Sequence, residues 1–165
     1  MTPFDEDLLQ AAASGIGATA VMDLWLLLLQ SLKIPTLNFA LLGRWVGHMP
    51  RGIWAHDSIA RAAPVRREQA LGWAVHYATG IGFAIMLVYW VGPQWLQNPT
   101  VLPALAVGVG TVTIPLLLMQ PAMGAGIASS RTKTPFLNCV KSLSNHTIFG
   151  LGLYASAQAN AYFFF

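Results

Sequence analysis

Residues 69–130 read QALGWAVHYATGIGFAIMLVYWVGPQWLQNPTVLPALAVGVGTVTIPLLLMQPAMGAGIASS and contain no Asp, Glu, Lys or Arg. A membrane-spanning helix needs about 20 apolar residues, each adding a rise of about 1.5 Å, so this stretch is long enough for two spans and a connection. The connection lies at residues 92–99, GPQWLQNP, because Gly, Pro and Asn interrupt helices. We therefore predict transmembrane helices over residues 69–91 and 100–128.

The second helix of this pair is unusually long and rich in proline. At about 1.5 Å per residue it would measure about 43 Å, against roughly 30 Å for the hydrocarbon core of a bilayer. Pro103, Pro115 and Pro121 each remove a backbone hydrogen bond and favour a kink. We expect a bent or tilted helix, and the alternative is a broken helix that lines a cavity.

Two further apolar stretches flank the pair. Residues 8–32 are interrupted only by Asp23, and residues 135–160 only by Lys141. The residues before the first stretch are acidic, and the stretch is long, whereas a cleaved signal peptide begins with basic residues and is shorter. The chain is thus predicted to be an all-α bundle of four transmembrane helices that forms a single membrane domain over residues 1–165.

The composition supports this prediction. Of the 165 residues, 55% are hydrophobic and 9% are charged, whereas a soluble domain carries about 25% charged residues. A soluble enzyme domain, a disordered tail and a coiled coil are therefore excluded. Cys139 is the single cysteine of the sequence, which excludes an internal disulfide and a multi-cysteine zinc or iron–sulfur site.

The basic residues gather in two of the segments between the predicted spans. Because Lys and Arg collect on the cytoplasmic side of a membrane, we predict that residues 33–68 and 129–134 are cytoplasmic and that both termini lie on the opposite side. The net charge of +3 then reflects topology, and we expect no nucleic-acid binding. The bases are Lys33, Arg44, Arg51, Arg61, Arg66 and Arg67 in the first segment and Arg131 and Lys133 in the second.

The segment 33–68 is predicted to form an amphipathic helical hairpin at the inner membrane interface. Thr36 or Asn38 can cap a helix in which apolar residues recur every three or four positions as far as Met49, and a second short helix is expected over residues 55–63. Its arginines would contact anionic headgroups. The alternative is a lid over the cytoplasmic mouth of the bundle. The candidate site residues of the loop are Asn38, His48, His56 and Asp57.

The most polar side chains of the four spans are predicted to form a layer. Counting about 1.5 Å per residue from the cytoplasmic ends places them about 9 to 17 Å deep, in the inner half of the bilayer. A charged group that faces lipid costs at least about 2.5 kcal/mol, so we expect the layer to face the bundle interior. Its members, the candidate ligand- or proton-binding residues, are Asp23, His76, Gln120, Lys141, Asn145 and His146.

This layer has a structural and a functional interpretation. In the first, Asp23 pairs with Lys141 and the layer only fixes helix packing. In the second, which we favour because ionisable residues inside a membrane mark functional sites, it binds or conducts a small polar or ionic ligand in transport or sensing. The expected partners are membrane lipids and, because four helices make a thin bundle, a second copy of the chain or a larger membrane assembly.

Two alternatives assign the chain to other functional classes. The first is a membrane-embedded enzyme, or a protein that binds haem or a transition metal through Asp23, His76 and His146, whose side chains have suitable chemistry. Closely spaced ligand motifs such as H-x-x-x-H are missing from the sequence, which disfavours a metal, and the sequence leaves catalysis undecided. The second alternative is an accessory subunit of a larger complex.

Four stretches of the chain resemble a bacterial membrane family that is known only as domain of unknown function twenty-nine thirty-eight. The resemblance extends from about residue 15 to residue 154 and implies a small protein of the bacterial inner membrane, but no reaction and no site residues. With the basic segments in the cytoplasm, both termini then lie in the periplasm. The stretches are GATAVMDLW (17–25), KIPTLNFALLGRWVGHMPRG (33–52), MQPAMGAG (119–126) and NCVKSLSNHTIFGLGLY (138–154).

Overall fold

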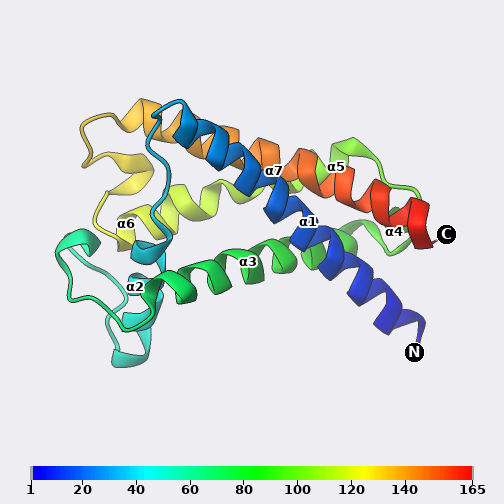
Figure 1. The fold of residues 1–165 in the computed structure, drawn as a ribbon, viewed down its shortest axis with the longest axis horizontal. Coiled ribbons are helices and arrows are strands. Elements are labelled where there is room, and N and C mark those ends of the chain that lie inside the picture. The colour runs from blue at the N-terminus through cyan, green and yellow to red at the C-terminus, as the bar shows by residue number, and fades with distance from the viewer. Residues whose placement is uncertain (1, 165) are drawn as a thin grey trace. The chain divides into compact units, whose positions relative to one another are not determined.

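The computed structural model describes residues 2–164, and this part of the chain is all-α (Figure 1). The prediction of an all-α protein is therefore confirmed. The helices are α1 (Pro3–Ser31), α2 (Phe39–His48), α3 (Glu68–Val91), α4 (Gln94–Gln97), α5 (Val101–Thr111), α6 (Gln120–Ala122) and α7 (Pro135–Phe164). Short 3₁₀ turns lie at Met49–Arg51, Ile59–Arg61 and Ile127–Ser129, and a π-helical turn lies at Pro115–Met119.

Among the described residues, three helical segments are long and apolar enough to cross a membrane: Phe4–Ser31, Glu68–Val91 and Val101–Ala122. They correspond to the first three of the four predicted spans and support a membrane protein. The helix α7 is equally long, but its first half carries polar side chains such as Asn138, Lys141 and Asn145. It is therefore not among these three candidate spans.

The third of these segments is not one continuous α-helix. The helix α5 ends at Thr111, a π-helical turn follows at Pro115–Met119, and the helical path ends at Ala122, earlier than the predicted residue 128. Proline at position 115 has no N–H to give to the carbonyl four residues earlier, which disturbs the α-helical ladder. The Gln120 N–H then bonds to the Pro115 carbonyl, five residues back, as a π-helix requires.

Two helices are predicted in the segment 33–68, and the structure contains one α-helix there. The predicted helix is present as α2, and Asn38 rather than Thr36 caps it, because Asn38 Oδ1 accepts from the Ala40 N–H at 2.9 Å. The second helix expected over residues 55–63 is wrong: only the 3₁₀ turn Ile59–Arg61 forms there. A stretch this short, between Ser58 and Pro64, has too few backbone bonds to sustain an α-helix.

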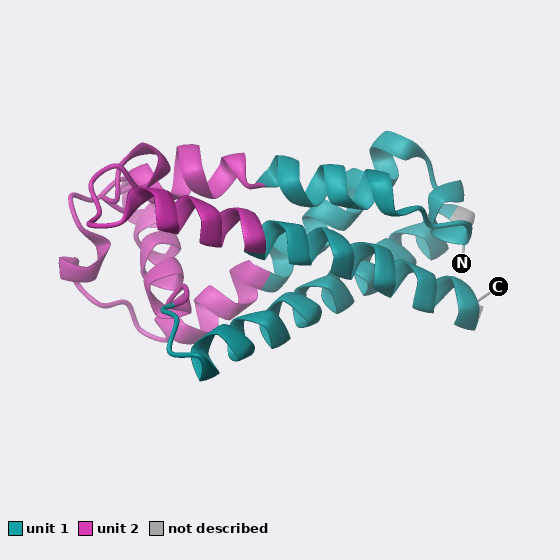
Figure 2. Ribbon diagram, turned by 90° about the horizontal axis from the view of Figure 1, so that it is seen from above, with its two compact units in different colours: residues 1–35, 77–111, 145–165 teal, residues 36–76, 112–144 magenta. Residues whose placement is uncertain are grey.

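The chain divides into two compact units, which Figure 2 shows in different colours. Unit 1 consists of residues 1–35, 77–111 and 145–165, and unit 2 of residues 36–76 and 112–144. The helices α3 and α7 each contribute one part to both units.

Unit 1 has a core of small and medium apolar side chains, among them Ala18, Leu87, Ala104 and Leu153. Glycines bring its helices together. A Cβ added at Gly15 of α1 would lie 2.7 Å from the Gly80 carbonyl oxygen of α3, and one at Gly108 of α5 would lie 2.6 Å from the Gly150 Cα of α7. Such close backbone approach between small residues is how helices associate in membranes.

Unit 2 packs the short helix α2 across the beginning of α3. Phe39 and Leu42 of α2 are buried, and so is Ile59 in the following turn. The crossing point has no room for side chains, because a Cβ added at Gly43 would lie 2.6 Å from the Gly72 backbone nitrogen. The amphipathic helix predicted from the sequence thus packs against α3 through its apolar face.

A pair of glycines in α5 tests this packing. Gly108→Ala forces α5 away from α7 and should destabilise the protein by about 1–3 kcal/mol, the usual cost of overpacking. Gly110→Ala is the matched control, because no described atom lies within 4 Å of the added methyl group and alanine favours a helix. Thermal unfolding in detergent should show a lower Tm for Gly108→Ala alone. Equal Tm values for the two variants would contradict the packing.

Candidate functional site

In unit 1, three hydrogen bonds between side chains connect its four long helical segments. The Tyr77 hydroxyl on α3 donates to Asp23 Oδ2 on α1 at 2.8 Å. The Trp25 Nε1–H, also on α1, donates to Asn145 Oδ1 on α7 at 3.0 Å. The third pair, His146 and Thr111, joins α7 to α5. The sequence of contacts therefore runs from α3 to α1, then to α7 and then to α5.

The third bond pairs His146 of α7 with the buried Thr111 of α5. The hydroxyl of Thr111, a buried residue, donates its single proton to the Gly108 carbonyl oxygen at 2.9 Å. The same hydroxyl oxygen lies 3.1 Å from His146 Nδ1, within hydrogen-bond distance. Which of these two atoms donates depends on the tautomer of His146.

The residues around these bonds are small on the faces where the helices meet. Gly15, Thr19 and Asp23 follow one another at intervals of four along α1, as expected for one face of a helix. Gly15 and Thr19 are buried, and Gly15 packs against the Gly80 backbone of α3. The Thr19 hydroxyl donates back to the Gly15 carbonyl at 2.8 Å, so this side chain needs no water. This face of α1 is thus directed at α3.

In unit 2, Gln120 and His76 have partners of different kinds. Gln120 Oε1 accepts from the Ser129 hydroxyl at 2.9 Å, and Gln120 Nε2 donates to Ser142 Oγ on α7 at 3.4 Å. The His76 ring lies against Phe39, with ring centroids 4.6 Å apart, and also contacts Trp73. Gln120 therefore connects the end of the third span to α7, whereas His76 sits among aromatic rings.

The predicted layer is divided between the two units. Asp23, Asn145 and His146 belong to unit 1, and His76, Gln120 and Lys141 to unit 2. Lys141 is half-buried on α7, and its ion pair with Asp23 stays a prediction. Within residues 2–164, no three His, Cys, Asp or Glu side chains gather closely enough to hold a metal ion, so the metal candidates Asp23, His76 and His146 do not form such a group.

The loop candidates of unit 2 also find neighbours. His48 Nδ1 and His56 Nε2 lie 2.8 Å apart. The His56 N–H donates to the Ala122 carbonyl at 2.8 Å, which ties the loop to the end of the third span. Asp57 is exposed, and Asn38 serves as the cap of α2. Of the four candidates, His48 and His56 are thus brought together, whereas Asn38 has a local structural role.

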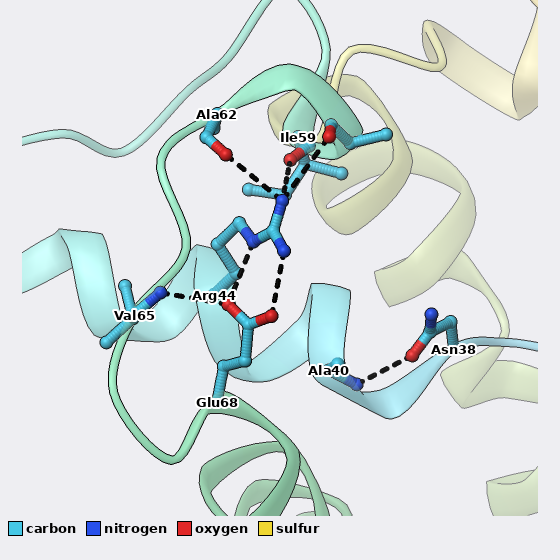
Figure 3. Close-up of polar contacts among 8 residues, drawn as sticks. Asn38, Ala40, Arg44, Ile59, Ala62, Val65 and Glu68 are labelled. Atoms are coloured by element: carbon cyan, nitrogen blue, oxygen red, sulfur yellow. Dashed lines mark hydrogen bonds and ion pairs between the residues drawn. The ribbon is translucent and has the colours of Figure 1, made fainter.

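The strongest ion pair of the loop joins Arg44 of α2 to Glu68 at the start of α3 (Figure 3). Arg44 Nε and Nη2 donate to the two Glu68 carboxylate oxygens at 2.9 and 2.8 Å. Arg44 Nη1 also donates to three backbone carbonyls, those of Ile59, Ala60 and Ala62. The bonds to Glu68 raise the pKa of the Arg44 guanidinium further above its ordinary value, so it stays charged at every accessible pH.

Sequence reasoning missed several of these partners. Tyr77, Trp25 and Thr111 are uncharged and lie within apolar helices, yet each supplies the polar atom that a candidate residue needs. The available signal was that a Tyr hydroxyl or Trp N–H buried in a helix must find an acceptor. Arg44 was expected at lipid headgroups and is instead a structural residue. Glu68 is the last acidic residue of the chain and follows a strongly basic loop, which could have indicated the pair.

Residues 12–160 match a protein family with the description "Protein of unknown function (DUF2938)". The chain belongs to this family. The match confirms the resemblance seen in the sequence, and it spans all the candidate residues from Asp23 to His146. The DUF2938 description gives no reaction and no ligand, so the function must be argued from the geometry of the site. No curated protein and no solved structure matches the chain.

The Arg44–Glu68 pair yields a stability prediction. Glu68→Gln leaves a charged guanidinium without its carboxylate in a place where the two side chains are only 12% and 17% exposed, so unit 2 should become less stable. Arg66→Gln is the control, because Arg66 is an exposed residue two positions before Glu68. Thermal unfolding should give a clearly lower Tm for Glu68→Gln and an unchanged Tm for Arg66→Gln. A Tm unchanged in both would show that the pair is dispensable.

Proposed function

We propose that this protein is a small protein of the bacterial inner membrane with four transmembrane helices, which binds or conducts a small polar or ionic ligand in transport or sensing. The spans are α1, α3, the segment Val101–Ala122 and α7. The ligand residues within unit 1 are Asp23, Asn145 and His146. The other members of the predicted layer, His76, Gln120 and Lys141, belong to unit 2 and remain part of the proposal.

The contacts of α7 support its assignment as the fourth span. Three of its polar side chains are hydrogen-bonded to residues of other helices: Asn145 to Trp25, His146 to Thr111 and Ser142 to Gln120. This pattern suits a helix in lipid, where polar groups must be satisfied within the protein. Most of its exposed large side chains are apolar, as a lipid-facing surface requires. They include Phe136, Leu137, Val140, Leu143 and Leu151.

The observation that carries the ligand proposal is the set of three hydrogen bonds in unit 1. A carboxylate lies inside the apolar helix α1 and an imidazole lies on α7, and ionisable groups within membrane-spanning helices are costly and mark ion or substrate pathways. The bond from Tyr77 to Asp23 and the bond between His146 and Thr111 hold these two groups in defined orientations. A role in packing alone would compensate little of this cost, because a hydrogen bond between membrane helices stabilises the fold by only about 0.6 kcal/mol on average.

The distribution of charge supports a cytoplasmic unit 2 and a periplasmic location of both termini. The exposed basic residues of unit 2 outnumber its exposed acidic residues, because Asp57 is the only exposed acidic residue among its described side chains. Lys and Arg near the ends of spans are retained in the cytoplasm. A bundle this thin is further proposed to work as a homodimer or within a larger membrane assembly. The exposed bases of unit 2 are Arg51, Arg61, Arg66, Arg67, Arg131 and Lys133.

Ion flux tests this function directly. We expect the purified protein in proteoliposomes to move protons or Na⁺ down an imposed gradient, as recorded by an entrapped pH dye or by a Na⁺ dye. Asp23→Asn and His146→Gln should reduce the flux to the level of protein-free vesicles, because each removes an ionisable group of the site.

Asn160→Ala is the matched control for this experiment. Asn160 Nδ2 donates to Ser14 Oγ at 3.0 Å, so it also makes a bond between α7 and α1 in unit 1, but outside the candidate site. Its flux should equal that of the parent protein. Equal losses in Asn160→Ala and in the two site variants would indicate that the polar pairs act only in packing, and an absence of flux in the parent would contradict ion transport.

A further inference from the structure

Two histidines of unit 2 share a single hydrogen bond. His48 ends α2 and is 4% exposed, and its Nδ1 lies 2.8 Å from His56 Nε2, with the two rings stacked at a centroid distance of 5.0 Å. The other nitrogen of the second ring, His56 Nδ1, is buried and has no hydrogen-bond partner among residues 2–164. Water therefore has little access to His48 and to His56 Nδ1, whereas His56 as a whole is half-buried.

The number of protons that this contact can hold follows from its geometry. A bond between two imidazole nitrogens needs one N–H and one lone pair, so a single proton lies between His48 Nδ1 and His56 Nε2. In the neutral pair a second proton lies on one outer nitrogen, and one further proton can be added to the other outer nitrogen while the bond persists. When both rings are fully protonated, two N–H groups and two positive charges face each other, and the bond is lost.

The same histidine holds the loop to the third span. The backbone N–H groups of His56 and Ile59 donate to the carbonyls of Ala122 and Met123, at 2.8 and 3.0 Å. The chain turns away directly afterwards at Gly124, which has a φ of +93° and would bring an added Cβ against the His56 and Asp57 carbonyls. Loss of the bond between the two rings would therefore loosen the segment that makes these backbone contacts.

We propose that His48 and His56 form a proton-binding site that latches residues 56–59 to the end of the third span, and that full protonation of the pair in acid releases this segment. The latched state can hold one proton fewer than two fully protonated histidines, so acid favours the released state. The ratio of latched to released protein should then fall by up to about tenfold for each pH unit of acidification. This inference does not depend on the ligand proposed above.

The charged side chains around the pair do not compensate the second positive charge that full protonation would create. Glu68 of α3 is near enough to His48 to interact electrostatically, but its carboxylate is already bound to Arg44 of α2. Asp57 and Arg61 are exposed, so water screens them. The segment 120–126 contains no ionisable residue.

Hydrogen–deuterium exchange of the full chain in detergent tests the latch. The protection factors of the His56 and Ile59 amides, corrected for the pH dependence of chemical exchange, should be high near neutral pH and at least about tenfold lower at about pH 5. Amides in the middle of α1, such as that of Leu26, should keep their protection. Equal protection of the His56 and Ile59 amides at both pH values would overturn the proposal.

The variant His48→Asn/His56→Gln separates titration from structure. The Asn amide group can occupy the position of Nδ1 and the Gln amide group that of Nε2, so a hydrogen bond remains possible but neither side chain titrates. Its protection should be independent of pH, whereas the control Asp57→Asn should respond as the parent does. A double variant that loses protection in acid like the parent would refute the latch.

A second measurement covers the case in which the double variant does not fold. Nitrogen NMR of the imidazoles in the parent protein should show that the pair takes up only one proton while the His56 amide is still protected. Two histidines that both become fully protonated with the amide still protected would equally refute the proposal.

Discussion

Polar atoms placed inside apolar helices must find partners within the protein, and this constraint explains most of unit 1. A helix in lipid satisfies its own backbone, but a carboxylate, an amide or an imidazole on its side cannot be satisfied by hydrocarbon. Asp23, Asn145 and His146 are each bound by a group from a different helix: Tyr77, Trp25 and Thr111. The apolar residues of these helices determine that they associate with lipid, and the polar pairs determine which helix faces meet.

In the third span, an interruption of the helix leaves backbone carbonyls to which the loop binds. Proline at position 115 forces a π-helical turn, and the helical path stops at Ala122, so the carbonyls of its last residues lack helical donors. The loop supplies those donors through the His56 and Ile59 N–H groups. A proline-rich stretch that looks unfavourable for a long helix is therefore compensated by the loop that precedes it in the sequence.

Much of the fold could be predicted because it depends on local patterns. The length of the apolar stretches indicated the three apolar spans, and the spacing of apolar residues after Asn38 indicated α2 with its cap. The candidate residues were recognised because Asp and His are rare in apolar helices. The assignment of the fourth span and of the site itself remains a prediction.

The rest could not be predicted because it depends on contacts between residues far apart in the sequence. Trp25 and Asn145 are separated by most of the chain, and nothing in either local sequence specifies the other. Arg44 reads as one of several similar bases, and only the crossing of α2 over α3 brings it to Glu68. The π-helical turn was missed for a related reason: the prolines predicted a disturbance of the helix but not its form.

The bond between Trp25 and Asn145 allows the most direct measurement of the central claim, that polar side chains of unit 1 pair across helices. Trp25→Phe and Asn145→Leu each remove one partner, and the two changes together remove both. If the bond exists, the free energies of unfolding should show a coupling of about 0.6 kcal/mol, and up to about 1.7 kcal/mol, the range for such bonds between membrane helices. Effects that simply add, with no coupling beyond about 0.3 kcal/mol, would contradict the account.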